Sequence, residues 1–268
     1  MKPTLHIFGL AIDSYTLMMV LGALLSFVLV LLINHKKKEF QLPKKDIVFL
    51  CCFVLFGASF GARFLFFITM IPTFHSVKEA LRCLFVDGGL VFYGGAIGGI
   101  LMGILYVKLY GLDLLKYMEL ILPVLPFGHA LGRIGCFLSG CCYGKLVDAQ
   151  HGFHFASLNE GEYALPVQLY EACFLFLLSA CLITCTFLLK KKKPYLMSGL
   201  YFFCYGIWRF IIEFFRGDEI RGVYLLSTSQ WISIVIIAIG AYFLFFHPEK
   251  CPFFQQQNPW IKKKEVEE

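Results

Sequence analysis

The chain has 268 residues, of which 59% are hydrophobic and only 16% are charged, and its formal net charge is +6. Soluble domains are roughly one half apolar and one quarter charged, and a soluble core of this size cannot bury so much apolar surface. The composition therefore excludes an ordinary soluble domain. It indicates a membrane protein whose chain crosses the bilayer several times.

Runs of roughly 20 apolar residues, the length that a helix needs to cross a bilayer, predict an all-α protein with about seven transmembrane helices. The predicted spans are residues 14–33, 47–70, 89–108, 117–140, 166–189, 196–214 and 223–246. Most connections between them are short, and no linker or long repeat stands out. We therefore expect residues 1–268 to form a single integral membrane domain.

The placement of lysine and arginine predicts the orientation, because cytoplasmic loops carry an excess of these residues. Lysines gather at 36–38, 44–45, 108–116, 190–193 and 250–264, all in loops on one side of the predicted spans. The loops on the other side hold only Lys2, Lys78, Arg82, Lys145, Arg216 and Arg221. The N-terminus is therefore expected outside and the C-terminus in the cytoplasm. The positive charge is interpreted as a topology signal, so no nucleic-acid partner is expected.

Three arginines fall within predicted spans: Arg63 in the second, Arg133 in the fourth and Arg209 in the sixth. A charge at this depth costs at least about 2.5 kcal/mol and usually faces a partner, a polar cavity or a ligand. The spans hold two glutamates, Glu171 and Glu213, and Asp87 and Glu119 lie at span ends. The excess of arginine predicts a pocket for an anionic lipid headgroup, since guanidinium groups suit phosphate.

Arg209 and Glu213 are four residues apart and share one helical face. The alternative to a phosphate-binding role for Arg209 is therefore an internal salt bridge with Glu213, which would only allow the span to insert.

In the third span, Gly94 and Gly98 form one row of glycines, and Gly95, Gly99 and Gly103 form another. Glycines at this spacing allow helices to approach closely. The glycine pairs at 88–89 and 94–95 also suit backbone contacts with a ligand, although no strand or Gly-Lys-Ser/Thr motif supports nucleotide binding.

The fourth predicted span contains Pro123 and Pro126, which predict a kink whose freed carbonyls need other partners. After it come three thiols, Cys136, Cys141 and Cys142, with His151 and His154 nearby. This spacing matches no closed zinc pattern, so the sequence predicts no metal site and no cofactor. The cysteines within the apolar runs are expected to act as small hydrophobic residues.

Six segments resemble, in matching order, patterns of the prolipoprotein diacylglyceryl transferase family, over about residues 10 to 246. They are residues 14–17, 61–63, 88–95, 132–144, 165–171 and 209–216. The family's Arg-Phe-x-x-Glu-Phe-Phe-Arg is matched outright by the last of these segments. Four positions depart from the family: Tyr93 and Leu165 stand where it has histidine, Cys136 where it has asparagine, and Cys141 where it has glutamate.

The resemblance implies a transferase of the bacterial cytoplasmic (inner) membrane. Its expected substrates are phosphatidylglycerol, which donates a diacylglyceryl group, and the lipobox cysteine in the signal peptide of a prolipoprotein, which accepts it. The catalytic residues implied are Arg133, Arg209, Glu213 and Tyr93. The substrate-binding residues implied are Tyr15, Arg63, Gly94, Gly95, Cys136, Gly144, Gln168, Tyr170, Glu171 and Arg216.

The sequence leaves the base open. Tyr93 needs a depressed pKa to serve, since tyrosine titrates near 10. Positive potential that lowers the pKa of the acceptor thiol is a second option, and His129 is a third. Two other functions also remain open: a related phospholipid-using transferase with a different acceptor, and a nonenzymatic protein that binds or transports lipid.

Overall fold

The computed structural model describes residues 4–7, 10–74, 76–83, 89, 91–189, 193, 195–217, 222–223, 225–246, 250–251 and 253–254. Several residues used in the sequence analysis lie outside these ranges: Lys2, Asp87, Gly88, Arg221, and part of the lysine clusters at 190–193 and 250–264.

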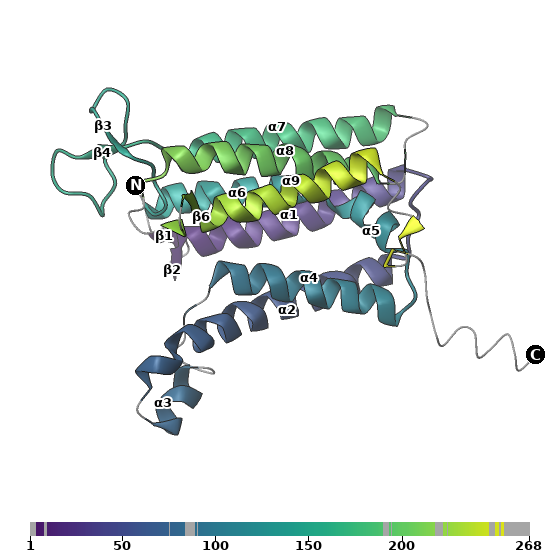
Figure 1. Cartoon of the computed structure of the whole chain (residues 1–268), viewed down its shortest axis with the longest axis horizontal. Helices are drawn as coiled ribbons and strands as arrows, with labels where there is room; N and C mark the ends of the chain where they lie inside the picture. Colours follow the sequence, from purple (N-terminus) through teal and green to yellow (C-terminus); the bar gives the residue numbers. More distant parts are fainter. Residues whose placement is uncertain are drawn as a thin grey trace, which may run out of the picture. The chain divides into compact units, whose positions relative to one another are not determined.

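The described chain is mostly helical (Figure 1). Its α-helices are α1 (Ser14–Lys36), α2 (Lys44–Met70), α3 (Val77–Arg82), α4 (Phe92–Leu109), α5 (Leu114–Ile121), α6 (Leu125–Ser139), α7 (Val167–Leu188), α8 (Leu196–Ile212) and α9 (Thr228–Phe245). Short 3-10 helices follow α2 (η1, Ile71–Thr73) and α8 (η3, Glu213–Phe215). Three antiparallel hairpins pair β1 (Thr4–Ile7) with β2 (Leu10–Asp13), β3 (Leu146–Val147) with β4 (Tyr163–Ala164), and β5 (Gly222–Val223) with β6 (Leu226–Ser227).

Within the described ranges, five helical segments are long and apolar enough to cross a membrane: α1, α2 with η1, α4, α7 and α9. A sixth results if α5 and α6 form one broken span. The prediction of a helical protein that crosses the membrane several times is thus confirmed. The prediction of a helix across 223–246 is wrong at its start, because α9 begins at Thr228 after the β5–β6 hairpin. Ser227 caps that helix together with Gln230 in a capping box.

The predicted kink in the fourth span is confirmed as a 47° bend between α5 and α6. Pro123 lies in the break between them and Pro126 lies in the first turn of α6. The hydroxyl of Ser179 on α7 donates a 2.8 Å hydrogen bond to the carbonyl oxygen of Pro123. A neighbouring side chain therefore satisfies a carbonyl at the break, as backbone in an apolar environment requires.

Glu119, the acidic residue at the start of the same predicted span, is buried and caps the N-terminus of α8. Its Oε1 accepts hydrogen bonds from the Ser198 amide at 2.8 Å and the Ser198 hydroxyl at 2.9 Å, and its Oε2 accepts one from the Met197 amide at 3.3 Å. A carboxylate at a helix N-terminus satisfies amides that have no partner within the helix and faces the positive end of the dipole. The charge of Glu119 thus has a structural role.

We expect the Glu119→Ala substitution to destabilise the protein by roughly 1–3 kcal/mol, because it leaves buried donors at the start of α8 without their acceptor. The measurement is the unfolding free energy in mixed micelles. Glu160→Ala, which removes an exposed carboxylate from the β3–β4 loop, is the matched control and should have little effect. Equal stability of the two variants would contradict the capping role.

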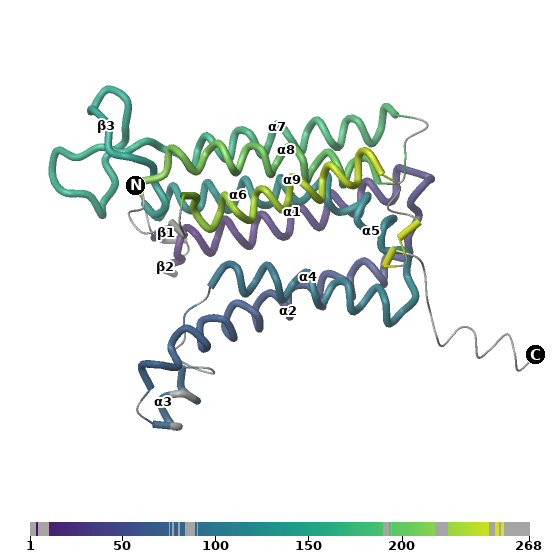
Figure 2. Tube along the Cα trace, in the orientation of Figure 1, coloured from purple at the N-terminus to yellow at the C-terminus, as the bar shows by residue number. Residues whose placement is uncertain are grey.

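The chain divides into two compact units. The first consists of Met1–Phe40 and Leu115–Cys251, and the second of Gln41–Leu114 and Pro252–Glu268. In the first unit, α6 packs against α1 and α7, while α8 packs against α7 and α9 (Figures 1 and 2). The single membrane domain over residues 1–268 stays a prediction.

In the second unit, α2 and α4 pack closely through glycines, as the spacing of the glycine rows predicts. A Cβ atom on Gly98 would overlap the carbonyl oxygen of Gly57, and one on Gly94 would overlap that of Gly61. The second row is looser, since a Cβ on Gly99 would lie 3.4 Å from the carbonyl oxygen of Val54. Gly94 and Gly98 therefore set the distance between these helices.

We expect Gly98→Ala to destabilise the second unit by roughly 1–3 kcal/mol, because the added methyl meets backbone that cannot rotate away. Gly99→Ala is the matched control, since the same methyl on the next residue makes an ordinary contact. Thermal stability of the two purified variants in detergent measures the difference. A Gly99→Ala variant as unstable as Gly98→Ala would show that helix approach is not the cause.

Candidate active site

Glu171 on α7 is buried between two arginines from neighbouring helices. Its Oε2 lies 3.1 Å from Nε of Arg133 on α6, and its Oε1 lies 3.2 Å from Nη1 of Arg209 on α8. The Glu171 side chain is 2% exposed, so its charge depends on these partners. One carboxylate therefore joins α6, α7 and α8.

Arg209 is held on three sides. Its Nη2 lies 2.7 Å from Glu213 Oε2 and donates a 3.0 Å hydrogen bond to the hydroxyl of Ser229 on α9. The predicted pairing of Arg209 with Glu213 is confirmed, and Glu171 is a further partner. The guanidinium group of Arg209 is therefore held in place by Glu171, Glu213 and Ser229.

The guanidinium group of Arg133 has fewer partners than that of Arg209. Its pairing with Glu171 runs through Nε, and in the described part of the chain no other hydrogen bond or ion pair of Arg133 is found. The terminal nitrogens of this guanidinium are the pair that can bind two oxygens of one phosphate. The side chain is 15% exposed. Arg133 thus has donors left for an anion.

The chain after α6 turns back on itself. Gly140, with φ 73°, ends the helix in the left-handed region, and Cys142, with φ 62°, has a left-handed conformation that non-glycine residues seldom adopt. The side-chain amide of buried Gln168 donates a 2.6 Å hydrogen bond to the carbonyl oxygen of Cys141. This turn brings the thiols of residues 141 and 142 back toward Cys136 on the last turns of α6.

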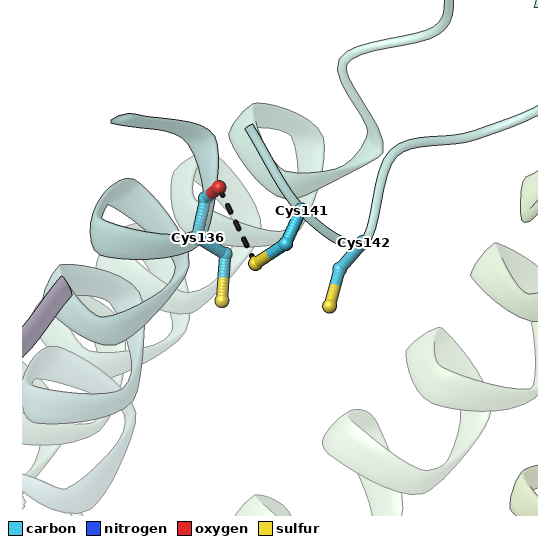
Figure 3. Close-up of side chains that lie close together, drawn as sticks. All are labelled: Cys136, Cys141 and Cys142. Carbon is cyan, nitrogen blue, oxygen red and sulfur yellow. Dashed lines mark hydrogen bonds between the residues drawn. The ribbon is translucent and has the colours of Figure 1, made fainter. Parts of the chain in front are cut away.

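The three sulfur atoms of Cys136, Cys141 and Cys142 all lie within 4.8 Å of one another (Figure 3). Hydrogen bonds from the Cys136 and Cys141 thiols, with the positive charge of Arg216, hold the pKa of the Cys142 thiol well below its ordinary value. The spacing of these residues does not reveal the cluster, because it depends on the turn at 140–142.

Backbone contacts of Gly144 position Arg216 beside the thiol cluster. The two residues form an isolated antiparallel bridge, and the amide of Lys145 donates a 2.9 Å hydrogen bond to the carbonyl oxygen of Phe215. A Cβ on Gly144 would meet both Val167 and this same carbonyl oxygen. Glycine at 144 thus allows the strand-like contact that positions Arg216, which is buried.

Tyr15, Tyr170 and His129 belong to the same unit, but their described contacts do not include the carboxylates of Glu171 and Glu213. Tyr15, on the first turn of α1, packs against Gly135 of α6, because a Cβ on that glycine would be 3.2 Å from its Cα atom. Tyr170 on α7 is 43% exposed. The candidate base His129 has its ring edge-on to Tyr205, with the ring centres 5.7 Å apart.

The remaining predicted residues belong to the second unit. Arg63 lies on α2, while Tyr93, Gly94 and Gly95 lie in the first turn of α4. Gly94 packs against Gly61, and the amide of Gly95 donates a hydrogen bond to the carbonyl oxygen of Val91. The role of these four residues in substrate binding or catalysis stays a prediction.

In the described part of the first unit, Arg133 and Arg209 thus pair with the buried carboxylates of Glu171 and Glu213, and buried Arg216 lies beside Cys142. Fixed guanidinium groups in an apolar setting stabilise an oxyanion without having to reorganise. This fold and this site define a helical membrane protein in which arginines paired with buried carboxylates lie near a cluster of thiols.

The comparison with known proteins identifies the family. Residues 3–246 match the family described as prolipoprotein diacylglyceryl transferase. The phosphatidylglycerol--prolipoprotein diacylglyceryl transferase of Clostridium tetani (strain Massachusetts / E88) is 35% identical over 246 residues, which are 90% of this chain and 96% of the relative. The protein of the same name from Rickettsia rickettsii (strain Sheila Smith) is 34% identical over 242 residues, 88% of this chain and 92% of the relative. The chain belongs to the prolipoprotein diacylglyceryl transferase family.

Proposed function

We propose that this protein transfers the diacylglyceryl group of phosphatidylglycerol to the lipobox cysteine thiol of bacterial prolipoproteins. The observation that carries the proposal is the buried carboxylate of Glu171, which pairs with both Arg133 and Arg209 while the terminal nitrogens of Arg133 remain for a phosphate. Family membership supports the same donor and acceptor, since the relatives are named for both.

The reaction gives each charged residue a role. The acceptor sulfur attacks the glycerol carbon next to the phosphate, and glycerol 1-phosphate leaves with growing negative charge. Arg133 binds the phosphate, Arg209 is a second contact, and Glu171 and Glu213 hold the two guanidinium groups in place. Stabilisation of developing charge by fixed donors is a large contribution to catalysis of this kind.

We propose that the other predicted residues contact or position the two substrates. Tyr93 is kept as a candidate base, and Arg63 as a further phosphate contact. The proposed substrate-binding residues are Tyr15, Gly94, Gly95, Cys136, Gly144, Gln168, Tyr170 and Arg216. Of these, Gln168 acts by holding the carbonyl oxygen of Cys141 in the turn after α6, and Gly144 acts through the backbone bridge that positions Arg216.

We also propose the finer topology. Counting α5–α6 as one crossing and adding the 17-residue α8 gives seven crossings, with the N-terminus outside the bacterial inner membrane and the C-terminus in the cytoplasm. The lysine-rich loops on one side support this orientation. Reporter fusions after each helix test it. A fusion at residue 150 that reports the cytoplasm would overturn the proposal, since the proposed topology places the loop between α6 and α7 outside.

The activity test uses the purified full chain with phosphatidylglycerol and a synthetic lipobox peptide. We expect the peptide to gain one diacylglyceryl group by mass spectrometry, with one equivalent of glycerol phosphate released. A peptide with serine in place of the lipobox cysteine is the control. Phospholipid that binds but is never cleaved would overturn the proposal in favour of a lipid-binding protein.

Complementation separates the proposed reaction from that of a related transferase. A bacterial strain depleted of its own diacylglyceryl transferase should regain lipoprotein processing when it expresses this chain. Headgroup release without rescue, together with an unmodified lipobox peptide, would overturn the proposed acceptor and leave the phospholipid as donor.

A further inference from the structure

The geometry of the three thiols is that of a metal site with three protein ligands and one open coordination position. A tetrahedral zinc ion binds thiolates at about 2.3 Å, which places neighbouring sulfurs about 3.8 Å apart. The sulfurs of Cys136, Cys141 and Cys142 already lie within 4.8 Å of one another, and Figure 3 shows the three side chains side by side, with the Cys141 sulfur between the other two. Small changes in side-chain rotamer therefore suffice to close them around one ion.

Contacts outside the cluster hold its backbone. Gln168 fixes the Cys141 carbonyl oxygen at 2.6 Å, and the left-handed conformations of Gly140 and Cys142 set the turn. Supporting hydrogen bonds of this kind orient metal ligands and raise affinity. The three thiols are thus brought together by the fold before any ion binds.

The charge around the cluster fits a thiolate site. Three thiolates and one divalent ion carry a net charge of −1, which in an apolar environment needs a positive neighbour. Arg216 lies beside Cys142, and Arg133 lies one helical turn before Cys136 on α6. Soft thiolate ligands select zinc, copper(I) and iron–sulfur clusters over hard cations.

We propose that Cys136, Cys141 and Cys142 bind one zinc ion whose fourth position takes the thiol of the acceptor cysteine. The proposal rests on the proposed function, to which it adds a way of activating the nucleophile that needs no base such as Tyr93. A catalytic zinc site has three protein ligands and an open position, and a coordinated thiol loses its proton. Cys141 is exposed, which leaves the cluster accessible to a peptide.

The step balances without a base from the protein. On binding zinc, the acceptor thiol releases its proton to water. Its sulfur then attacks the glycerol carbon, so that a carbon–sulfur bond forms while the carbon–oxygen bond to the phosphate breaks. The electron pair of that bond stays on the phosphate oxygen, and glycerol 1-phosphate leaves as its dianion beside Arg133. Zinc keeps its oxidation state throughout. The proposed zinc site differs from the prediction of no metal site, which rested on cysteine spacing alone.

The first test measures metal without activity. Full-length protein purified in detergent and incubated with zinc alone should hold one zinc per chain after removal of the excess. Cys136→Ser and Cys142→Ser should each lower zinc affinity at least about tenfold. Cys173→Ser, which changes an exposed thiol on α7, is the matched control and should bind normally. Substitution with cobalt(II) should give sulfur-to-metal charge-transfer absorption in the wild type but not in the Cys142→Ser variant, provided that both elute alike on gel filtration.

The second test asks whether the acceptor enters the site. X-ray absorption at the zinc edge should show three sulfur ligands alone and four with a lipobox peptide, while a peptide with serine at the same place should leave three. Zinc that binds but gains no fourth sulfur would overturn the role in activation. Active protein with no bound zinc, or with a disulfide within the cluster, would overturn the site and leave the proposed function standing. Copper(I) in place of zinc in protein purified from cells would also overturn it.

Discussion

The Glu171→Ala variant is expected to lose about 3–5 kcal/mol of stability and nearly all transferase activity. Glu171 is the carboxylate shared by Arg133 and Arg209, and its side chain is 2% exposed. Removing one member of a buried ion pair leaves an uncompensated charge, and here two guanidinium groups, on the two helices that pack against α7, would lose the carboxylate between them. The unfolding free energy in mixed micelles and the rate of diacylglyceryl transfer measure the two effects.

Two further variants test the cause. Glu171→Gln preserves the shape and the acceptor oxygen but removes the charge, so it should recover packing while activity stays low. Glu160→Ala removes an exposed carboxylate and should behave as the wild type. A stable, active Glu171→Ala protein would mean that the two arginines are compensated by other groups, and the proposed network would be wrong.

The sequence predicted those parts of the site that follow from local spacing. Arg209 and Glu213 are four residues apart on one helix, so their pairing could be read directly from helical periodicity. The bend near Pro123 follows as directly from the missing amide of proline. The close approach of α2 and α4 at Gly94 and Gly98 also follows from spacing.

The position of Glu171 between two arginines could not be predicted in the same way, because it depends on how α6, α7 and α8 pack. The thiol cluster depends on even less predictable features. Two of its members, Cys136 and Cys141, stand where the family resemblance places other polar residues, and the third has a left-handed conformation. From the sequence these positions were interpreted as lost polar groups. The fold shows that they are close together, and only a backbone turn that spacing does not encode makes this possible.

The Arg133→Ala variant is expected to transfer diacylglyceryl groups about a hundredfold more slowly, with the protein still folded. Loss of one fixed donor from an oxyanion site has an effect of this size on the chemical step. The fold should survive, because Glu171 keeps Arg209 as its partner, 3.2 Å away. Arg133→Lys keeps the charge but not the planar pair of donors, so it should recover only part of the rate.

The rate constant at saturating phosphatidylglycerol separates the proposed role from simple lipid binding. If Arg133 stabilises the leaving phosphate, the maximal rate falls, because the charge on that group grows only as the bond to carbon breaks. Arg82→Ala, which removes an exposed arginine from α3, controls for a general loss of positive charge. An Arg133→Ala variant with an unchanged maximal rate and only a raised KM would show that this arginine holds the lipid equally in the ground state and the transition state. In that case the stabilisation of the leaving group would have to come from Arg209, whose three contacts already fix it at the centre of the network.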